Sequence, residues 1–368
     1  MGCHPRRWML LPEGHGLWPG RPELSGRVRF LNLDTGTLAR PRIPLLATHC
    51  AIDSVDGLLL LLPWEPFLQD DAPVLLLHPF TGDAVQLPPL ATLLPQMDAY
   101  DLGPYKITRL TGRGVCASLS FDAAGVMTVM LSLHMKSRVA FATSMDRQWT
   151  LSTWSYQRTC SEVSFQGKLY TVHSEMSSGM HRVFQIDPPA PPQPQEQGAA
   201  GRAMALQPPK LIATVHVHKL GDCLGLVECG SELLVLFKDR QATSRVLVCK
   251  LADLVLQRFA PLNSIGGSVL FRGGRNISVC SKVLPMLMGD SVVYRCNKED
   301  GLYHAEYHLS SGTFSPAMDD CRLYGDAPGP SSLVHHIFSC CFRYQWPEDY
   351  YSGGTSVTVI GAHHEEEL

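Results

Sequence analysis

Short apolar runs alternate with polar turn residues along most of the chain. The runs are rich in Val, Leu, Phe and Tyr, and clusters of Gly, Pro, Asp and Ser separate them, as in GLLLLL, VMTVMLSL, ELLVLF and SRVLVCKL. Apolar residues at helical spacing are almost absent. Short apolar runs bounded by turn residues are typical of β-strands. The pattern therefore predicts an all-β fold.

One strand–turn–strand pattern recurs, each time with a glycine in the turn and a proline after the second strand. It appears as LNLDTGTLARP around Gly36, LLHPFTGDAVQLP around Gly82 and YHLSSGTFSP around Gly312. Glycine supplies the positive φ that a tight turn requires, and proline ends the outgoing strand. Looser equivalents are SMDRQWTLSTW, the IDPP turn and LADLVLQRFAP. Gly36 and Gly82 are 46 residues apart, and Gly82 and Gly312 are 230 apart, which is five such intervals.

A period of about 40–50 residues in an all-β chain predicts a β-propeller of four-stranded blades. Counting the turns predicts a single propeller of six blades, with seven as the alternative, and residues 49–90 form a complete blade. We expect the segment SSLVHHIFSCCF, residues 331–342, to be a strand that pairs with the N-terminal strands and closes the ring.

The predicted propeller domain spans residues 5–345, and residues 346–368 form a C-terminal tail with an acidic end. One segment inside the domain breaks the strand pattern. Residues 187–203, DPPAPPQPQEQGAAGRA, are rich in Pro and Gln and too polar to be buried. We expect a disordered loop there, between two outer strands of the fourth blade.

Composition and charge narrow the choice of partners and location. The formal net charge of −3 argues against a general surface for nucleic acid or anionic membrane. The longest leucine run, residues 58–62 followed by Pro63, is far shorter than the roughly 20 residues of a membrane helix. Twelve cysteines lie scattered, without the spacing of a disulfide framework, and the N-terminus has no signal-peptide pattern. These features predict free thiols in the cytoplasm, the nucleus or both.

Several segments, taken in order, resemble a plant protein family. They are IDSVDGLLLLL, LLLHPFTGDAVQLPPL, FQGKLYTV, CLGLVECGSELLVLFKD, VCKLADLVLQRFAPLNSIGGSVLFRGGRNISV and GDSVVYRCN. The family is the KIB-type β-propeller domain (domain of unknown function 295), which is common in plant F-box proteins. The resemblance runs from PRRWMLLPEG to about Phe342, but His78 stands where the family has Asn, and Leu58 where it has an aromatic residue.

The resemblance implies a function as well as a fold. In family members with an N-terminal F-box, that segment binds the adaptor of a cullin-type ubiquitin ligase, and the propeller captures the protein to be ubiquitinated. This chain begins almost directly in the propeller, so we expect the ligase adaptor as a partner only if an F-box exists upstream. The family has no established catalytic residues, so the resemblance assigns none here.

Histidine pairs are the candidates for metal chemistry. His216 and His218 share a strand face, but zinc sites need three or four ligands. His304 and His308 lie on one strand about 13 Å apart, too far to share a metal ion. His335–His336 and Cys340–Cys341 are neighbours that point to opposite faces of the expected closing strand. We therefore predict no metal site, no cofactor and no catalytic residue.

The sequence as a whole predicts a non-enzymatic protein-binding propeller with an unknown protein target. Four arginines in loops are candidates for a partner-binding basic rim, although solvated loop charges would look the same. Three alternatives stay open: a binding module that competes with relatives without recruiting a ligase, an enzyme that uses the propeller channel, and a gene-family remnant without function. The channel enzyme would need convergent carboxylates, which the sequence does not reveal. The four rim candidates are Arg109, Arg113, Arg272 and Arg275.

Overall fold

The computed structural model describes most of the chain. The described residues are 5–11, 24–63, 71–97, 115–133, 137–156, 161–175, 179–190, 205–216, 220–239, 245–298, 301–317, 322–323 and 333–341. Within them, no helix has the length and apolar character that a membrane crossing would need.

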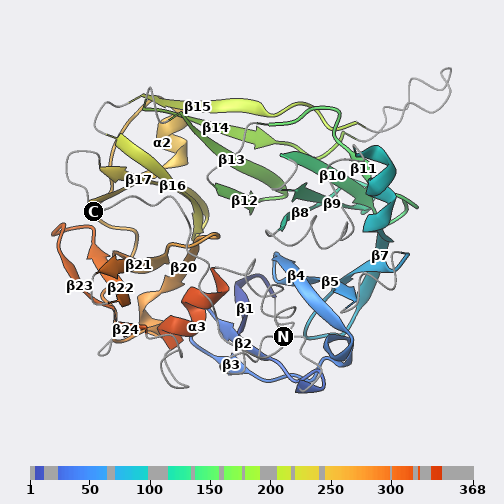
Figure 1. Cartoon of the computed structure of the whole chain (residues 1–368), viewed down its shortest axis with the longest axis horizontal. Helices are drawn as coiled ribbons and strands as arrows, with labels where there is room; N and C mark the ends of the chain where they lie inside the picture. The colour runs from blue at the N-terminus through green and yellow to red at the C-terminus, as the bar shows by residue number, and fades with distance from the viewer. Residues whose placement is uncertain are drawn as a thin grey trace.

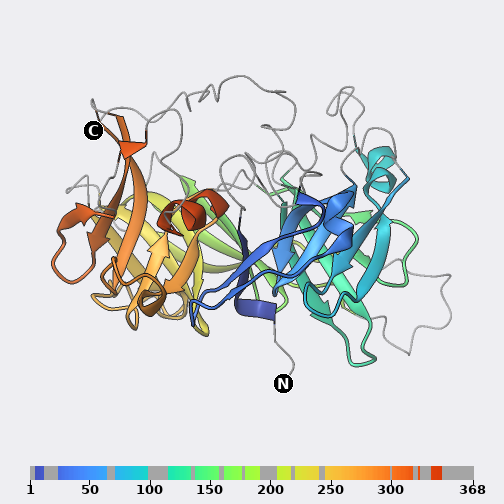
Figure 2. The ribbon, with the colours of Figure 1, turned by 90° about the horizontal axis from the view of Figure 1, so that it is seen from below.

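Six β-sheets stand in a ring around a central axis, as Figure 1 shows. We number them as blades 1 to 6 from the N-terminus. Figure 2 shows the ring side-on as a disc, with the short 3₁₀ helix η1 (Pro5–Arg7) at one face. The predicted count of six blades is confirmed, but the prediction of four strands in every blade holds, among the described residues, only for blades 2, 3 and 4.

The first three blades contain eleven described strands. Blade 1 has three strands, and blades 2 and 3 have four each, all antiparallel to their neighbours. Residues 49–90 hold one complete blade, as the sequence predicts. The strands are β1 (Trp8–Leu11), β2 (Arg29–Asn32) and β3 (Leu38–Ala39) in blade 1, β4 (His49–Val55), β5 (Leu58–Pro63), β6 (Pro73–Leu77) and β7 (Ala84–Pro89) in blade 2, and β8 (Val115–Phe121), β9 (Met127–Leu133), β10 (Arg138–Thr143) and β11 (Thr150–Leu151) in blade 3.

The last three blades depart further from a uniform four strands. Blade 4 has four strands, blade 5 has three described ones, and blade 6 has six, with β19 and β21 parallel. The strands are β12 (Ser161–Phe165), β13 (Lys168–Glu175), β14 (Met180–Ile186) and β15 (Lys210–His216) in blade 4, β16 (Leu220–Cys229), β17 (Glu232–Asp239) and β18 (Val246–Lys250) in blade 5, and β19 (Ser268–Phe271), β20 (Ile277–Cys280), β21 (Ser291–Lys298), β22 (Gly301–His308), β23 (Phe314–Pro316) and β24 (Arg322–Leu323) in blade 6.

The apolar cores lie between blades, one at each junction. Along β5, Leu59 and Leu61 pack toward blade 1, while Leu60 and Leu62 pack toward blade 3. Successive residues of a strand point to opposite faces, so a strand with both faces covered must be apolar throughout. This arrangement explains the unbroken leucine run of residues 58–62.

The ring closes in a way that the sequence analysis did not foresee. The C-terminal segment is a helix, α3 (Leu333–Cys340), and not a strand. The described strands of blade 1 all come from residues 8–39. Helix α3 packs Val334, Ile337 and Phe338 into the core between blades 6 and 1. The predicted closure by pairing of N- and C-terminal strands is therefore wrong, because α3 seals the junction through apolar packing.

A second helix replaces one of the looser repeats. The segment LADLVLQRFAP was expected to form a strand–turn–strand unit, but it begins as helix α2 (Leu251–Val255). Leu251 and Leu254 pack into the core between blades 4 and 5. Leu262 then donates its backbone N–H to the Val248 carbonyl at 2.8 Å, so the chain covers part of the β18 edge.

The Pro/Gln-rich segment lies where it was expected in the topology. It connects β14 and β15, which are neighbouring outer strands of blade 4. Residues 191–204 fall outside the described residues, so the predicted disorder of residues 187–203 stays a prediction.

The three predicted turns share one hydrogen-bond pattern. In each turn the glycine N–H donates to the carbonyl four residues earlier, at 2.9 Å for Gly36, 3.0 Å for Gly82 and 2.8 Å for Gly312. All three glycines have positive φ, between 69° and 80°. In each turn a hydroxyl also accepts a backbone N–H from two residues later at 3.3 Å; the pairs are Thr35–Thr37, Thr81–Asp83 and Ser311–Thr313.

The first two turns also explain why histidine stands at position 78. In the turn around Gly36, Asn32 Oδ1 accepts the N–H groups of Asp34 and Thr35, both at 3.0 Å. In the turn around Gly82, His78 Nδ1 accepts those of Phe80 and Thr81 at 3.3 and 3.1 Å. The imidazole nitrogen of His78 therefore accepts the same two hydrogen bonds as the side-chain oxygen of Asn32. Asparagine is the residue that the resembling family has at position 78.

Candidate functional site

The inner strands β1, β4, β8, β12, β16 and β20 surround the axis (Figure 1), and polar side chains connect them across it. Asp53 is an almost fully buried member of this group, with 1% of its surface exposed. It lies on β4, where the pairing with β5 shifts register after Ala51. Asp53 Oδ2 accepts the Ala117 N–H of blade 3 at 2.7 Å, and Oδ1 accepts the Ser54 N–H at 2.7 Å.

Arg275 completes the Asp53 cluster from blade 6, which lies on the far side of blade 1 from Asp53. It lies between β19 and β20 in blade 6, and its Nη1 forms an ion pair with Asp53 Oδ1. The adjacent carboxylate raises the pKa of Arg275 above its ordinary value, against the effect of burial. The Arg275 backbone N–H also donates to the Cys341 carbonyl at 2.8 Å. One arginine thus connects blades 2 and 6 with the end of α3.

The four predicted rim arginines therefore do not form one described group. Arg109 and Arg113 lie outside the described residues. Arg272 is half-buried and donates its backbone N–H to the Val293 carbonyl at 2.8 Å. The charge of Arg275 is taken up by Asp53 inside the ring, so it is not a free charge at a rim.

Blades 4, 5 and 6 meet at a close approach around Gly225. Asn276 Nδ2 of blade 6 donates to the Leu224 and Leu226 carbonyls of β16, at 3.3 and 3.1 Å. Ser161 of blade 4 accepts the Leu226 N–H at 3.2 Å. Gly225 has φ of +123°, and a Cβ at this position would lie 2.5 Å from Asn276 Nδ2. Glycine is needed here because both the backbone angle and the neighbouring side chains leave no room for a Cβ.

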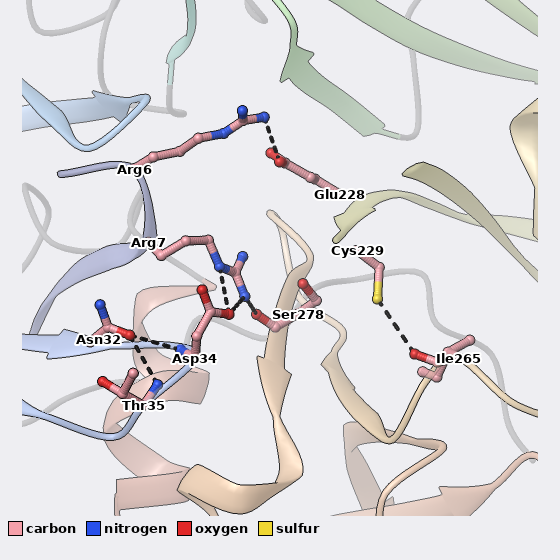
Figure 3. Close-up of polar contacts among 9 residues, drawn as sticks. All are labelled: Arg6, Arg7, Asn32, Asp34, Thr35, Glu228, Cys229, Ile265 and Ser278. Carbon is pink, nitrogen blue, oxygen red and sulfur yellow. Dashed lines mark hydrogen bonds and ion pairs between the residues drawn. The ribbon is translucent and has the colours of Figure 1, made fainter. Parts of the chain in front are cut away.

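Two consecutive arginines of η1, Arg6 and Arg7, form polar contacts with several blades, as Figure 3 shows. Arg6 Nη2 contacts Glu228 of blade 5 at 2.7 Å, and its Nε lies 3.7 Å from Asp56 of blade 2. Arg7 binds Asp34 at 2.9 Å and donates to the Ser278 carbonyl of blade 6 at 3.3 Å. Residues that precede the first blade thereby connect it to blades 2, 5 and 6.

A further polar cluster lies between blades 3 and 4. The hydroxyl of Ser132 donates to Glu162 Oε2 at 2.6 Å, and that of Tyr156 donates to Glu162 Oε1 at 2.8 Å. Burial, and then the neighbouring Glu162, raise the pKa of Tyr156 far above its ordinary value. Burial likewise raises the pKa of the Cys116 thiol on β8, so this thiol is not a thiolate nucleophile.

These polar side chains therefore mostly form hydrogen bonds and ion pairs within the protein. Asp53, Glu162 and Glu228 are the inner-strand carboxylates whose side chains are described, and each one accepts hydrogen bonds within the protein. A general acid or base needs an atom that can donate or accept a proton within hydrogen-bond reach of the substrate. These oxygens instead hold blades together.

The histidines predicted to be structural lie in several places. His216 is exposed on β15, and His218 is outside the described residues. His308 shares a 2.8 Å hydrogen bond between its Nε2 and Ser315 Oγ. His335 and His336 lie on α3, so the expected strand alternation does not apply to them. Among the described residues, no three or more His, Cys, Asp or Glu side chains converge as a metal site.

Sequence reasoning missed the residues that matter most at the axis, notably Asp53, Glu162 and Arg6. A weak signal was present, since a charged residue inside an apolar strand must find a partner when it is buried. Asp53 in CAIDSV and Glu162 in SEVSF are such residues. Their partners lie far away in sequence: Arg275 is 222 residues from Asp53.

Comparison with known proteins places the fold in a family. A family model described as KIB1-4 beta-propeller matches residues 30–315. A search of the curated proteins gives no match. Among solved structures, the chain is similar to TolB from Acinetobacter baumannii, with 11% identity, a TM-score of 0.31, and coverage of 87% of this chain and 66% of TolB. A structure from an analysis of two prolyl endopeptidases gives 12% identity, a TM-score of 0.31, and coverage of 84% and 49%. The chain thus spans less than two thirds of either structure, and similarity at this level says nothing about its activity.

Proposed function

Because the chain belongs to the KIB1-4 β-propeller family, we propose that it is a non-enzymatic protein-binding module. Its role is capture: a rigid ring presents loops that bind one face of a protein partner. The finer role is that of the substrate-recruiting part of a ubiquitin ligase, as the resemblance to F-box proteins suggests. Recruitment of the ligase itself depends on an F-box segment that precedes the propeller in such relatives.

The use of inner-strand carboxylates for internal contacts is the observation that supports this proposal most directly. Asp53 is held by Arg275 and two backbone N–H groups, and Glu228 is held by Arg6. Charges used in this way stiffen the ring, and a stiff scaffold lowers the entropy cost of binding through its loops.

Affinity capture from plant cell extract tests this function. The tagged full chain is compared with a tagged F-box-containing relative, and the bound proteins are identified by mass spectrometry. Each specific protein is then purified, and its binding to the full chain is measured by calorimetry. We expect at least one purified protein to bind with saturable one-to-one stoichiometry.

The composition of the captured complex separates the alternatives. Cullin and its adaptor in both captures would support ligase recruitment. A specific partner without them would leave a stand-alone binding module. If no captured protein binds in purified form, the protein-binding function is wrong.

A further inference from the structure

Two histidines from distant parts of the sequence meet under the helix that closes the ring. His304 lies on β22 and His335 on α3, 31 residues later in the chain. Their ring centres are 6.0 Å apart, with the planes tilted by 48°. The ring of Phe338, which is also on α3, packs against His304, with the two ring centres 4.4 Å apart. Neither histidine takes part in the axial contacts described above.

His304 is buried without a hydrogen-bond partner. Its exposed surface is 0%, and neither ring nitrogen has a partner. A neutral imidazole carries one N–H donor and one lone pair, and native proteins almost always satisfy such groups when they are buried. Each unsatisfied group has lost its hydrogen bonds to water without gaining any in return. A fully buried side chain of this kind points to a ligand at the lone pair.

The protonation state of His304 suits a metal ligand. Burial, together with the nearby His335 and Arg295, lowers the pKa of His304 to about 3. The imidazole is therefore neutral at physiological pH, which is the form that binds metal ions.

We propose that His304 and His335 together bind one monovalent copper ion in two-coordinate geometry. An ion held in line between two ring nitrogens, about 2 Å from each, sets the ring centres roughly 6 Å apart. The observed separation of 6.0 Å matches this arrangement. His335 is only half-buried, so an ion reaches the buried His304 from the edge of α3.

The surroundings favour monovalent copper over zinc. Zinc takes three or four protein ligands, and the described residues provide no third His, Cys, Asp or Glu ligand here. Imidazole is a good ligand for copper. Arg295 faces His304 across the β21–β22 pair, and its positive charge disfavours a divalent ion more than a monovalent one.

Anaerobic titration of the full chain with copper(I) tests the site. Copper is buffered by a colorimetric chelator in excess ascorbate, and bound copper per chain is measured for wild type, His304→Phe and His335→Gln. Because cysteines also bind copper(I), the readout is the difference between proteins. His216→Phe, which changes an exposed histidine on β15, is the matched control. We expect both site variants to lose one copper equivalent and the control to lose none.

Two measurements keep the result interpretable. Circular dichroism and thermal unfolding confirm that each variant is folded; His304→Phe keeps an aromatic ring against Phe338 and removes the unsatisfied nitrogens. Copper X-ray absorption of the wild type is expected to show nitrogen at about 2.0 Å and not only sulfur at about 2.3 Å. Equal copper content in wild type and folded His304→Phe, or a purely sulfur environment, would overturn the proposal and leave ordered water as the partner of His304.

Discussion

The outer turns and the inner axis of this propeller are built from different kinds of contact. Each outer turn is closed within six residues, as from His78 to Asp83, by the same backbone and hydroxyl hydrogen bonds. The axis is closed by contacts between residues far apart in sequence, such as Asp53 with Arg275 and Arg6 with Glu228. The turns lie mostly in water, whereas the Asp53 carboxylate is 1% exposed.

This difference implies an unequal sensitivity to substitution. A turn residue that is lost exposes its partners to water, which can replace the missing hydrogen bond. Removing an axial residue leaves its partner, a buried charge or hydrogen-bond donor, with neither a protein acceptor nor water. The same kind of substitution should therefore reduce stability more at the axis than in the outer turns.

The largest effect is expected for Asp53→Ala. The change leaves the Arg275 guanidinium without its carboxylate and the Ala117 N–H without an acceptor. Breaking a buried pair on one side costs about 3–5 kcal/mol. Urea unfolding measures the loss, with Asp34→Ala as control, because Asp34 is half-exposed in its pair with Arg7 and should cost at most about 1 kcal/mol. Similar losses for the two variants would contradict the comparison.

Glycine to alanine substitutions compare the two regions with one chemical change. Gly225→Ala places a Cβ 2.5 Å from Asn276 Nδ2 and 2.8 Å from Ser161 Oγ at positive φ, so we expect a loss of about 2–5 kcal/mol. Gly82→Ala meets nothing within 4 Å, so only the backbone strain of about 1–2 kcal/mol applies. Thermal unfolding of both variants checks this order. A larger loss of stability for Gly82→Ala than for Gly225→Ala would contradict it.

Acid should weaken the closure at α3. The pKa of His304 is lowered to about 3 in the folded protein, so the unfolded chain binds a proton at a higher pH than the folded one. Stability from this group is therefore complete above the unfolded pKa, about 6.5, and falls as the pH drops toward 3. We expect a loss of about 2 kcal/mol between pH 6 and pH 4. Urea unfolding at both pH values measures it in the metal-free protein, and His304→Phe should remove this part of the pH dependence.

The smallest effects are expected at position 78. His78→Ala removes the acceptor for the Phe80 and Thr81 N–H groups and should cost about 1 kcal/mol, since water can reach this turn. His78→Asn restores an acceptor like that of Asn32 and should stay within about 0.5 kcal/mol of wild type. Unfolding midpoints of the two variants give the answer. A loss for His78→Asn as large as that for His78→Ala would show that the imidazole has another role.

The sequence predicted well wherever the structure depends on near neighbours. Alternation and turn chemistry were enough for the strands of residues 49–90 and for the turns around Gly36, Gly82 and Gly312. These features are set by backbone φ and by hydrogen bonds within a few residues, which local sequence controls. Their regular spacing then favoured six blades, with seven as the alternative.

Local sequence alone predicts the wrong structure for the C-terminal segment. The apolar residues of positions 331–342 suit a buried strand as well as a buried helix, because short apolar runs cannot be assigned by periodicity alone. Tertiary packing favours the helix: Val334, Ile337 and Phe338 of α3 fill the core between blades 6 and 1.

By itself the sequence determined an all-β propeller and its outer turns and favoured six blades over seven, because these features depend on interactions between residues close together in the chain. Only the tertiary structure decided that Arg275 is the partner of Asp53, that Arg6 reaches Glu228, and that His304 meets His335. The physical reason is that folding into a ring brings different blades and the closing helix together, so the partner of a buried charge or imidazole is chosen by position in space and not by distance along the chain.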